Sequence, residues 1–144
     1  MNYAPASLKK VYIEPVQGAC NRRQLDAERA ASFFINNGFY LVSNPKEADV
    51  MLLVTCAVSI KREDSSIRRI NHLKKYSGEL IVGGCLPAIN EKRMLSVFNG
   101  RSIPTSELPK IDNFFPEMKI KFSELGDANQ YFPSYSKIFS PEFA

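Results

Sequence analysis

Three cysteines are the residues of this sequence whose type and spacing best suit chemistry. Cys20, Cys56 and Cys85 are separated by stretches that are each about as long as one β-α-β unit. Cys56 comes just after the apolar run Val50–Val54, which indicates a strand buried on both faces. Parallel strands end at one edge of a sheet, and ligands of open α/β sheets bind at that edge. We therefore expect the three thiols to lie together there.

The elements that position these thiols alternate between strand and helix along most of the chain. Alternation of this kind predicts right-handed crossovers and a parallel sheet. The predicted fold class is α/β, a three-layer flavodoxin-like (Rossmann-like) mostly parallel sheet with an aromatic, Pro-rich C-terminal extension. The expected strands are 10–14, 39–42, 50–54, 80–82 and 101–103, and the expected helices are 24–37, 62–76, 90–98 and 105–115.

Local residue types add expectations about how these elements begin and end. Asn21 is expected to cap the first helix, and Thr105 or Ser106 the last one, because these side chains accept hydrogen bonds from free helix N–H groups. Gly83-Gly84 is expected to form the turn that leads into Cys85.

The C-terminal part of the chain has a different character. We expect residues 1–115 to form one α/β domain, and residues 116–144 to be an extension or a linker toward an absent catalytic domain. Alternating apolar residues over 118–122 predict one more strand. The stretch 131–143 is too aromatic for a typical disordered tail, so we expect it to pack on this domain or on a neighbour.

Composition and charge are those of an ordinary globular protein of 144 residues. Apolar residues make up 44% of the chain and charged residues 24%. No apolar segment is long enough for a membrane span and no signal peptide is evident, so we expect a cytoplasmic protein with no membrane contact. An odd number of cysteines in that compartment argues against a disulfide framework. The net charge of +4 permits an anionic partner without requiring one.

Two interpretations of the three thiols stay open on the residues alone. They are either inert core thiols, since free cysteine is often simply a small buried residue, or metal ligands gathered by the fold. Three thiolates without a fourth ligand argue against structural zinc, which prefers four. Helix N-termini and glycines beside the thiols suit an anionic metal–sulfur group. Among metal groups, an iron–sulfur cluster with one open iron therefore fits better.

Two further hypotheses concern other parts of the chain. A flavodoxin-like nucleotide binder is one, although Gly83-Gly84 lacks the lysine and spacing of a phosphate-binding loop. The other is a cluster-free α/β module that contacts RNA or a partner enzyme through a basic helix, although a solvated helix face is the commoner explanation. The single histidine, His72, is interpreted as a solvated residue of that helix. The basic residues concerned are Lys61, Arg62, Arg68, Arg69, Lys74 and Lys75.

Short motifs around the cysteines point to a known family. The motifs are Lys10-Val-Tyr-Ile-Glu14, Cys20 followed by Asp26-Ala-Glu28, Glu47-Ala-Asp-Val50, Val54-Thr-Cys-Ala-Val58 and Val82-Gly-Gly-Cys85. In this order and spacing the sequence resembles the N-terminal domain of the radical-SAM methylthiotransferase family, over about residues 9–98. It departs from the family pattern at Ala19, where the family has Gly, and at Arg23, where the family has Asn.

The resemblance implies a cofactor and a partner. It implies that Cys20, Cys56 and Cys85 bind an oxygen-labile auxiliary [4Fe-4S] cluster, whose open iron takes part in sulfur transfer to tRNA or a ribosomal protein. It also implies a radical-SAM catalytic domain as partner, in cis or in trans, because this chain has no CxxxCxxC motif and no further cysteines. On this interpretation the chain alone does not cleave S-adenosylmethionine, and none of its own residues is assigned a catalytic role.

Overall fold

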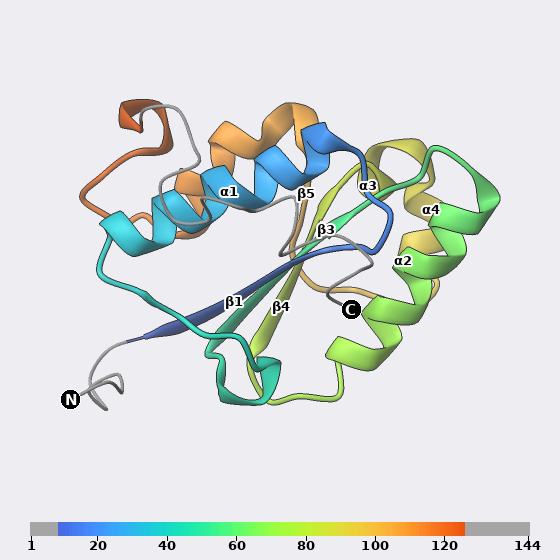
Figure 1. Cartoon of the computed structure of the whole chain (residues 1–144), viewed down its shortest axis with the longest axis horizontal. Helices are drawn as coiled ribbons and strands as arrows, with labels where there is room; N and C mark the ends of the chain where they lie inside the picture. Colours follow the sequence, from blue (N-terminus) through green and yellow to red (C-terminus); the bar gives the residue numbers. More distant parts are fainter. Residues whose placement is uncertain (1–8, 126–144) are drawn as a thin grey trace.

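The computed structural model describes residues 9–125, which fold around a five-stranded parallel sheet (Figure 1). The strand order is β2-β1-β3-β4-β5, and each neighbouring pair is parallel. This order confirms the predicted flavodoxin-like α/β fold, in which the first, third and fourth strands are adjacent. The strands are β1 (Lys10–Pro15), β2 (Tyr40–Leu41), β3 (Val50–Thr55), β4 (Glu79–Gly84) and β5 (Ser102–Pro104).

Helices connect the strands and cover both faces of the sheet. The α-helices are α1 (Asn21–Asn36), α2 (Ile60–Leu73), α3 (Leu86–Ile89) and α4 (Glu91–Leu95). The 3₁₀-helices are η1 (Pro45–Glu47), η2 (Thr105–Phe114) and η3 (Phe122–Glu124). Among the described residues, no helix combines the length and the apolar character needed to span a bilayer.

Strand β3 lies at the centre of the sheet, and all six of its residues are buried. Its side chains alternate between two cores, as the pleat of a strand requires. Leu52 packs into the core under α1 and η2, whereas Met51 and Leu53 pack into the core under α2, α3 and α4. The three-layer arrangement follows from this alternation, because each face of β3 needs a cover of helices.

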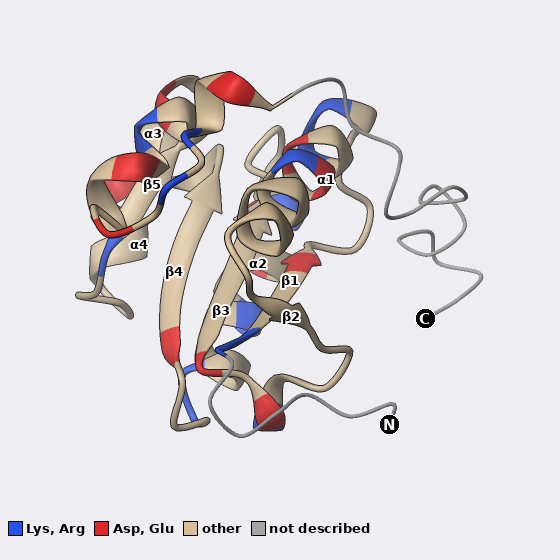
Figure 2. Cartoon of the chain, turned by 90° about the vertical axis from the view of Figure 1, so that its left-hand side faces the viewer, with Lys and Arg blue, Asp and Glu red and all other residues tan. Residues whose placement is uncertain are grey.

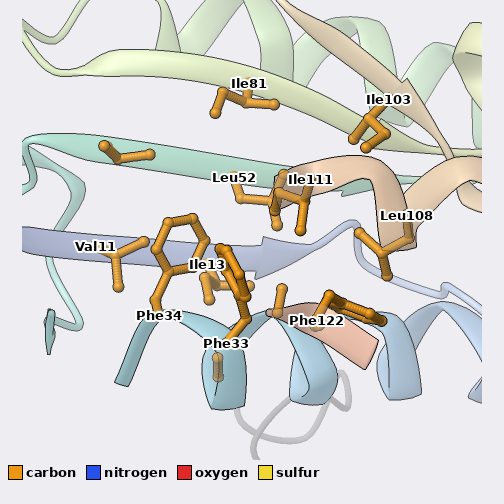
Figure 3. Close-up of a cluster of buried hydrophobic side chains, with 14 of the residues drawn as sticks. Val11, Ile13, Phe33, Phe34, Leu52, Ile81, Ile103, Leu108, Ile111 and Phe122 are labelled. Carbon is orange, nitrogen blue, oxygen red and sulfur yellow. The ribbon is translucent and has the colours of Figure 1, made fainter. Parts of the chain in front are cut away.

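Aromatic side chains of α1 pack together with aliphatic side chains of the sheet in the core on the α1 side (Figure 3). Phe33 and Phe34 are fully buried on α1, with ring centroids 5.4 Å apart in an edge-on arrangement. Phe115 lies 5.3 Å from Phe34, and Phe122 lies 6.2 Å from Phe33. Such pairs each add about 1 kcal/mol beyond the burial of their area. They join the segment after β5 to α1.

Charged residues are kept away from the middle of the sheet, as Figure 2 shows for β3 and most of β4. The charge on β4 is at its first residue, Glu79, which receives two hydrogen bonds of 2.7 Å from Arg101. Burying an unpaired charge is costly. The uncharged centre therefore marks the part of the sheet that water does not reach.

Several element boundaries differ from those predicted. Cys20 is the residue that precedes α1, so Asn21 is the first helical residue rather than the cap. Gly83-Gly84 belongs to the end of β4 rather than to a turn, because Gly84 pairs with Thr55 of β3. β4 therefore ends two residues later than the apolar pattern indicated, and β3 one residue later.

The C-terminal third shows larger differences. The helix expected over 90–98 is present only as α4, which the Asn90 side chain caps and which ends at Leu95. The short helix α3 that precedes it was not predicted. The last helix is a 3₁₀-helix preceded by Pro104, so neither Thr105 nor Ser106 acts as its cap. The strand predicted over 118–122 is absent, because side chains rather than a neighbouring strand pair with its backbone. The Asn37 side chain bonds both the N–H and the carbonyl oxygen of Ile120, and the Phe122 N–H donates to Asp112. The aromatic stretch 131–143 lies outside the described residues.

Gly84 is the glycine whose conformation most constrains the sheet edge. Its φ is +89°, and an added Cβ would lie 2.2 Å from the backbone carbonyl oxygen of Thr55. Gly38 shares the φ of +89°, but nothing lies within 4 Å of the place where its Cβ would be. The two glycines therefore separate the cost of a left-handed conformation from the cost of a backbone clash.

We predict that Gly84→Ala lowers the free energy of unfolding by about 3 kcal/mol or more, because a backbone clash is added to the left-handed strain. The matched variant Gly38→Ala should cost only about 1 kcal/mol. Chemical denaturation followed by circular dichroism measures both values. Equal losses in the two variants would show that the close approach of Gly84 to Thr55 does not matter.

Candidate metal centre

The three cysteines all follow strands at the carboxyl edge of the sheet. β1 and β3 end at nearly the same level, since Pro15 pairs with Val54, and β3 and β4 end together where Thr55 pairs with Gly84. Cys56 and Cys85 come directly after the last residues of β3 and β4. Cys20 comes after a short loop that follows β1. All three are free thiols.

Cys56 is held rigidly between β3 and α2. The Ser66 hydroxyl donates to the Cys56 carbonyl oxygen at 2.9 Å and accepts from the Cys56 N–H at 3.2 Å. Ser66 is fully buried, and Cys56 is only 1% exposed. Both backbone groups of Cys56 are thus paired by one side chain, which fixes the direction in which its thiol leaves the strand.

Cys85 is positioned by Thr55, the last residue of β3. The Cys85 N–H donates to the Thr55 carbonyl oxygen at 3.1 Å. The Thr55 hydroxyl donates to the Gly83 carbonyl oxygen at 2.5 Å and accepts from the Leu86 N–H at 3.1 Å. These bonds join the ends of β3 and β4, so Cys56 and Cys85 follow two neighbouring strands.

Cys20 lies on the loop that covers Cys56. Val16 continues the pairing of β1 by donating its N–H to Val54 at 2.9 Å, and Ala19 turns back to bond Val16 at 2.9 Å. Val16 and Ala19 form a small buried cluster with Cys56. Cys20 itself is exposed, and its side chain makes no capping hydrogen bond to α1. The Cys20 side chain therefore caps no helix N–H group, whereas Ser66 and Thr55 fix the backbone at the other two cysteines.

Arg23 connects the first and third cysteine loops. It stands on the first turn of α1 with 9% of its surface exposed, and its Nη1 donates to Cys85 Sγ at 2.8 Å. Its Nε lies 3.1 Å from Asp26 Oδ2, yet the Nε–H has no aligned hydrogen-bond acceptor. Asp26 in turn accepts a hydrogen bond of 2.6 Å from the Thr105 hydroxyl.

The charges around Arg23 influence one another. Burial by itself lowers the pKa of the Arg23 guanidinium, but Asp26, Cys85 and Cys20 raise it, and the net shift of the pKa is upward. Burial raises the pKa of Asp26, while the Thr105 bond and the neighbouring cations lower it, and the net shift is again upward. Arg23 therefore remains a cation beside the thiols, and burial disfavours the ionised form of Asp26, which faces it.

The structure brings the loops of Cys20, Cys56 and Cys85 to one edge, through the Cys56–Ala19 packing and the Arg23–Cys85 bond. Thiolates are the ligands that iron–sulfur clusters take, and a buried cation suits an anionic group. The donor chemistry of the edge thus fits the predicted cluster. Over residues 9–125, however, no three Cys, His, Asp or Glu side chains are grouped closely enough to bind a metal ion.

The sequence analysis missed the residues that arrange this edge. Thr55, Ser66 and Arg23 carry the hydrogen bonds that position the cysteines, and none was singled out for that role. For Arg23 a signal was present, because the sequence departs from the family pattern at that position. Thr55 and Ser66 are common residue types, and only the packing of α2 and β4 against β3 shows what they bond.

The basic helix α2 uses several of its cations within the domain. Arg69 donates hydrogen bonds of 2.5 and 2.7 Å to Glu14 on β1. The guanidinium of Arg62 lies over Gly18, and Lys74 donates to the Val97 carbonyl oxygen at 2.9 Å. His72 is exposed, in agreement with the sequence interpretation. These contacts account for part of the positive charge without a nucleic acid.

A cavity of about 540 Å³ lies away from the cysteines. It is bordered by Lys9 and Asn37, near the amino end of β1, and by the segment 117–120. The cysteines follow the opposite ends of the strands. This cavity is therefore not part of the candidate site.

The comparison with protein families identifies the class of domain. Residues 10–103 match the uncharacterized protein family UPF0004, and the chain belongs to this family. The UPF0004 domain is the N-terminal domain of methylthiotransferases, and related proteins are named tRNA methylthiotransferases. The resemblance drawn from the cysteine motifs is thereby confirmed.

Individual relatives are longer proteins. The tRNA-2-methylthio-N(6)-dimethylallyladenosine synthase of Karelsulcia muelleri is 34% identical over 119 residues, which cover 74% of this chain and 25% of that protein. The probable threonylcarbamoyladenosine tRNA methylthiotransferase of Methanocaldococcus jannaschii is 37% identical over 78 residues, which cover 54% and 18%. The chain spans about a quarter or less of the length of these relatives.

We predict that Thr55→Val destabilises the domain by about 2 to 3 kcal/mol, because the Gly83 carbonyl and the Leu86 N–H lose a buried partner. Thr55→Ser keeps the hydroxyl and should cost only about 1 kcal/mol for the lost methyl group. Denaturant unfolding of the two variants measures the difference. A serine variant less stable than the valine variant would contradict a role for the hydroxyl.

Proposed function

We propose that this domain holds an auxiliary [4Fe-4S] cluster through Cys20, Cys56 and Cys85, and that it takes part in the methylthiolation of a tRNA base. The observation that carries the proposal is the meeting of the three cysteine loops at the carboxyl edge, with a buried cation against one sulfur. Membership of the methylthiotransferase N-terminal family supports the same assignment.

The roles of the chain's own residues follow from their contacts. Cys56 and Cys85 present thiols from backbone that Ser66 and Thr55 hold in place. Cys20 supplies the third thiol from a loop in which its side chain makes no capping bond. When bound, the cluster would supply an open iron for sulfur chemistry. The protein's contribution is to orient the ligands and to exclude water at the buried side of Cys56.

The substrate and the partner belong to the same proposal. The relatives are named for methylthiolated adenosine derivatives of tRNA, which favours tRNA over a ribosomal protein as the substrate. A radical-SAM catalytic domain, in cis or in trans, is the expected partner, because this chain's three cysteines are all assigned to the auxiliary site. A cytoplasmic location, where tRNA is modified, completes the assignment.

No specific observation favours a cluster-free RNA-binding module. Its support was the basic face of α2, and Arg69 of that helix is committed to Glu14 through two hydrogen bonds. Lys74 likewise bonds the loop after α4. A cation that already has a partner gains less from a phosphate, since it must give up the bond it has.

The proposal predicts iron binding. After anaerobic treatment with iron and sulfide, the full chain should bind about four iron atoms and show sulfur-to-iron charge-transfer absorption. Changing Cys20, Cys56 or Cys85 to Ser should abolish most of this uptake, because each removes one of the three ligands. Iron and sulfide analysis together with the absorption spectrum measures the result.

Val58→Ala is the matched control, since Val58 lies two residues from Cys56 and is 71% exposed. It should bind as much iron as the unchanged chain. Fewer than about two irons in the unchanged chain, or full uptake in all three serine variants, would rule out the proposed cluster.

A further inference from the structure

We propose that Arg23 is a charge-positioning residue at the carboxyl edge of the sheet. Its guanidinium holds the Cys85 sulfur and favours anionic species there. The effect of the Arg23 charge on a bound cluster rests on the function proposed above, whereas its effect on the free Cys85 thiol does not.

The geometry places Arg23 within the site. Its side chain reaches from the first turn of α1 to a sulfur that lies 62 residues further along the chain, at 2.8 Å. With 9% of its surface exposed, it has little water to solvate its charge. A buried cation is stable only beside negative charge or hydrogen-bond acceptors.

The anchoring of the guanidinium shows that its direction is set. Asp26 lies 3.1 Å from Nε, and Asp26 is itself held by the Thr105 hydroxyl at 2.6 Å. The order Thr105, Asp26, Arg23, Cys85 thus runs from η2 through α1 to the edge of β4. Since the Nε–H of Arg23 has no aligned acceptor, the residue retains an unused donor at the site.

Two effects follow from a fixed positive charge at this sulfur. In the cluster-free protein, it attracts an anionic reagent to Cys85 more than a neutral one. With a cluster bound by three thiolates, the group is anionic, and its negative charge grows by one unit on reduction. A neighbouring cation therefore favours the reduced state and raises the reduction potential.

The first test uses the full chain without a cluster. Iodoacetate and iodoacetamide alkylate the same thiolate, so the ratio of their rates at Cys85 reports the local charge and does not depend on how much thiolate is present. Mass spectrometry of the Cys85 peptide measures both rates. We expect the ratio of the iodoacetate rate to the iodoacetamide rate to fall about fivefold in Arg23→Gln. Arg23→Lys, which keeps the charge, should restore most of the ratio.

Arg22→Gln is the matched control, because it removes an exposed arginine from the same turn of α1 and should leave the ratio unchanged. Circular dichroism shows whether each variant folds. If Arg23→Gln does not fold, Arg23→Met replaces it, since methionine keeps the apolar stem of the side chain. A ratio that stays the same in a folded neutral variant would overturn the inference.

The second test uses the reconstituted protein. A redox titration followed by electron paramagnetic resonance should give a more negative midpoint potential in Arg23→Gln than in the unchanged chain and in Arg22→Gln. An unchanged potential would also overturn the inference. If the unchanged chain binds no iron while the alkylation ratio still falls, the cluster proposal fails and the role of Arg23 stands.

Discussion

The burial of β3 on both faces is the constraint on which the rest of this structure depends. All six of its residues are buried, so each face must be covered by helices that come from different parts of the chain. Leu52 fixes the position of the layer formed by α1 and η2, and Leu53 that of the layer formed by α2 to α4. A parallel sheet results, because each helix must return the chain to the same end of the sheet.

This parallel arrangement is also what gathers the chemistry at one edge. β1, β3 and β4 are neighbours, and their carboxyl ends lie nearly level. Cysteines that are far apart in sequence are thereby brought onto loops that contact one another. Gly84 and Thr55 control how closely β3 and β4 approach, through a left-handed glycine at the end of β4 and a buried hydroxyl at the end of β3. The site thus depends on the same backbone pairing that builds the core.

Two arginines near this edge, Arg23 and Arg69, are each held by specific partners. Arg23 is buried against Cys85, and its carboxylate partner Asp26 is tied to η2. On the other face, Arg69 joins α2 to Glu14 of β1, and burial raises the pKa of the neighbouring Tyr12, as does Glu14. The tyrosine hydroxyl therefore remains protonated and donates to Glu14 at 2.6 Å. One cation stabilises a sulfur, and the other stabilises the contact between a strand and a helix.

The amino-acid sequence by itself determined the fold class and the strand order of the described residues. The apolar run at the centre of β3 and the regular alternation of strands with helices allow few other topologies. The motifs around Cys20, Cys56 and Cys85 were sufficient to identify the family. These features are encoded locally, by periodicity and by spacing, so they can be recognised before any contact is known.

Only the tertiary structure decided the boundaries and the supporting contacts. The residues expected as a strand over 118–122 do not form one, because the side chains of Asn37 and Asp112 bond the backbone of Ile120 and Phe122, and alternation alone does not reveal such partners. The bond from Arg23 to Cys85 spans 62 residues, and the pair from Thr105 to Asp26 spans 79. Such contacts depend on where separate elements meet in space, which local residue patterns do not specify.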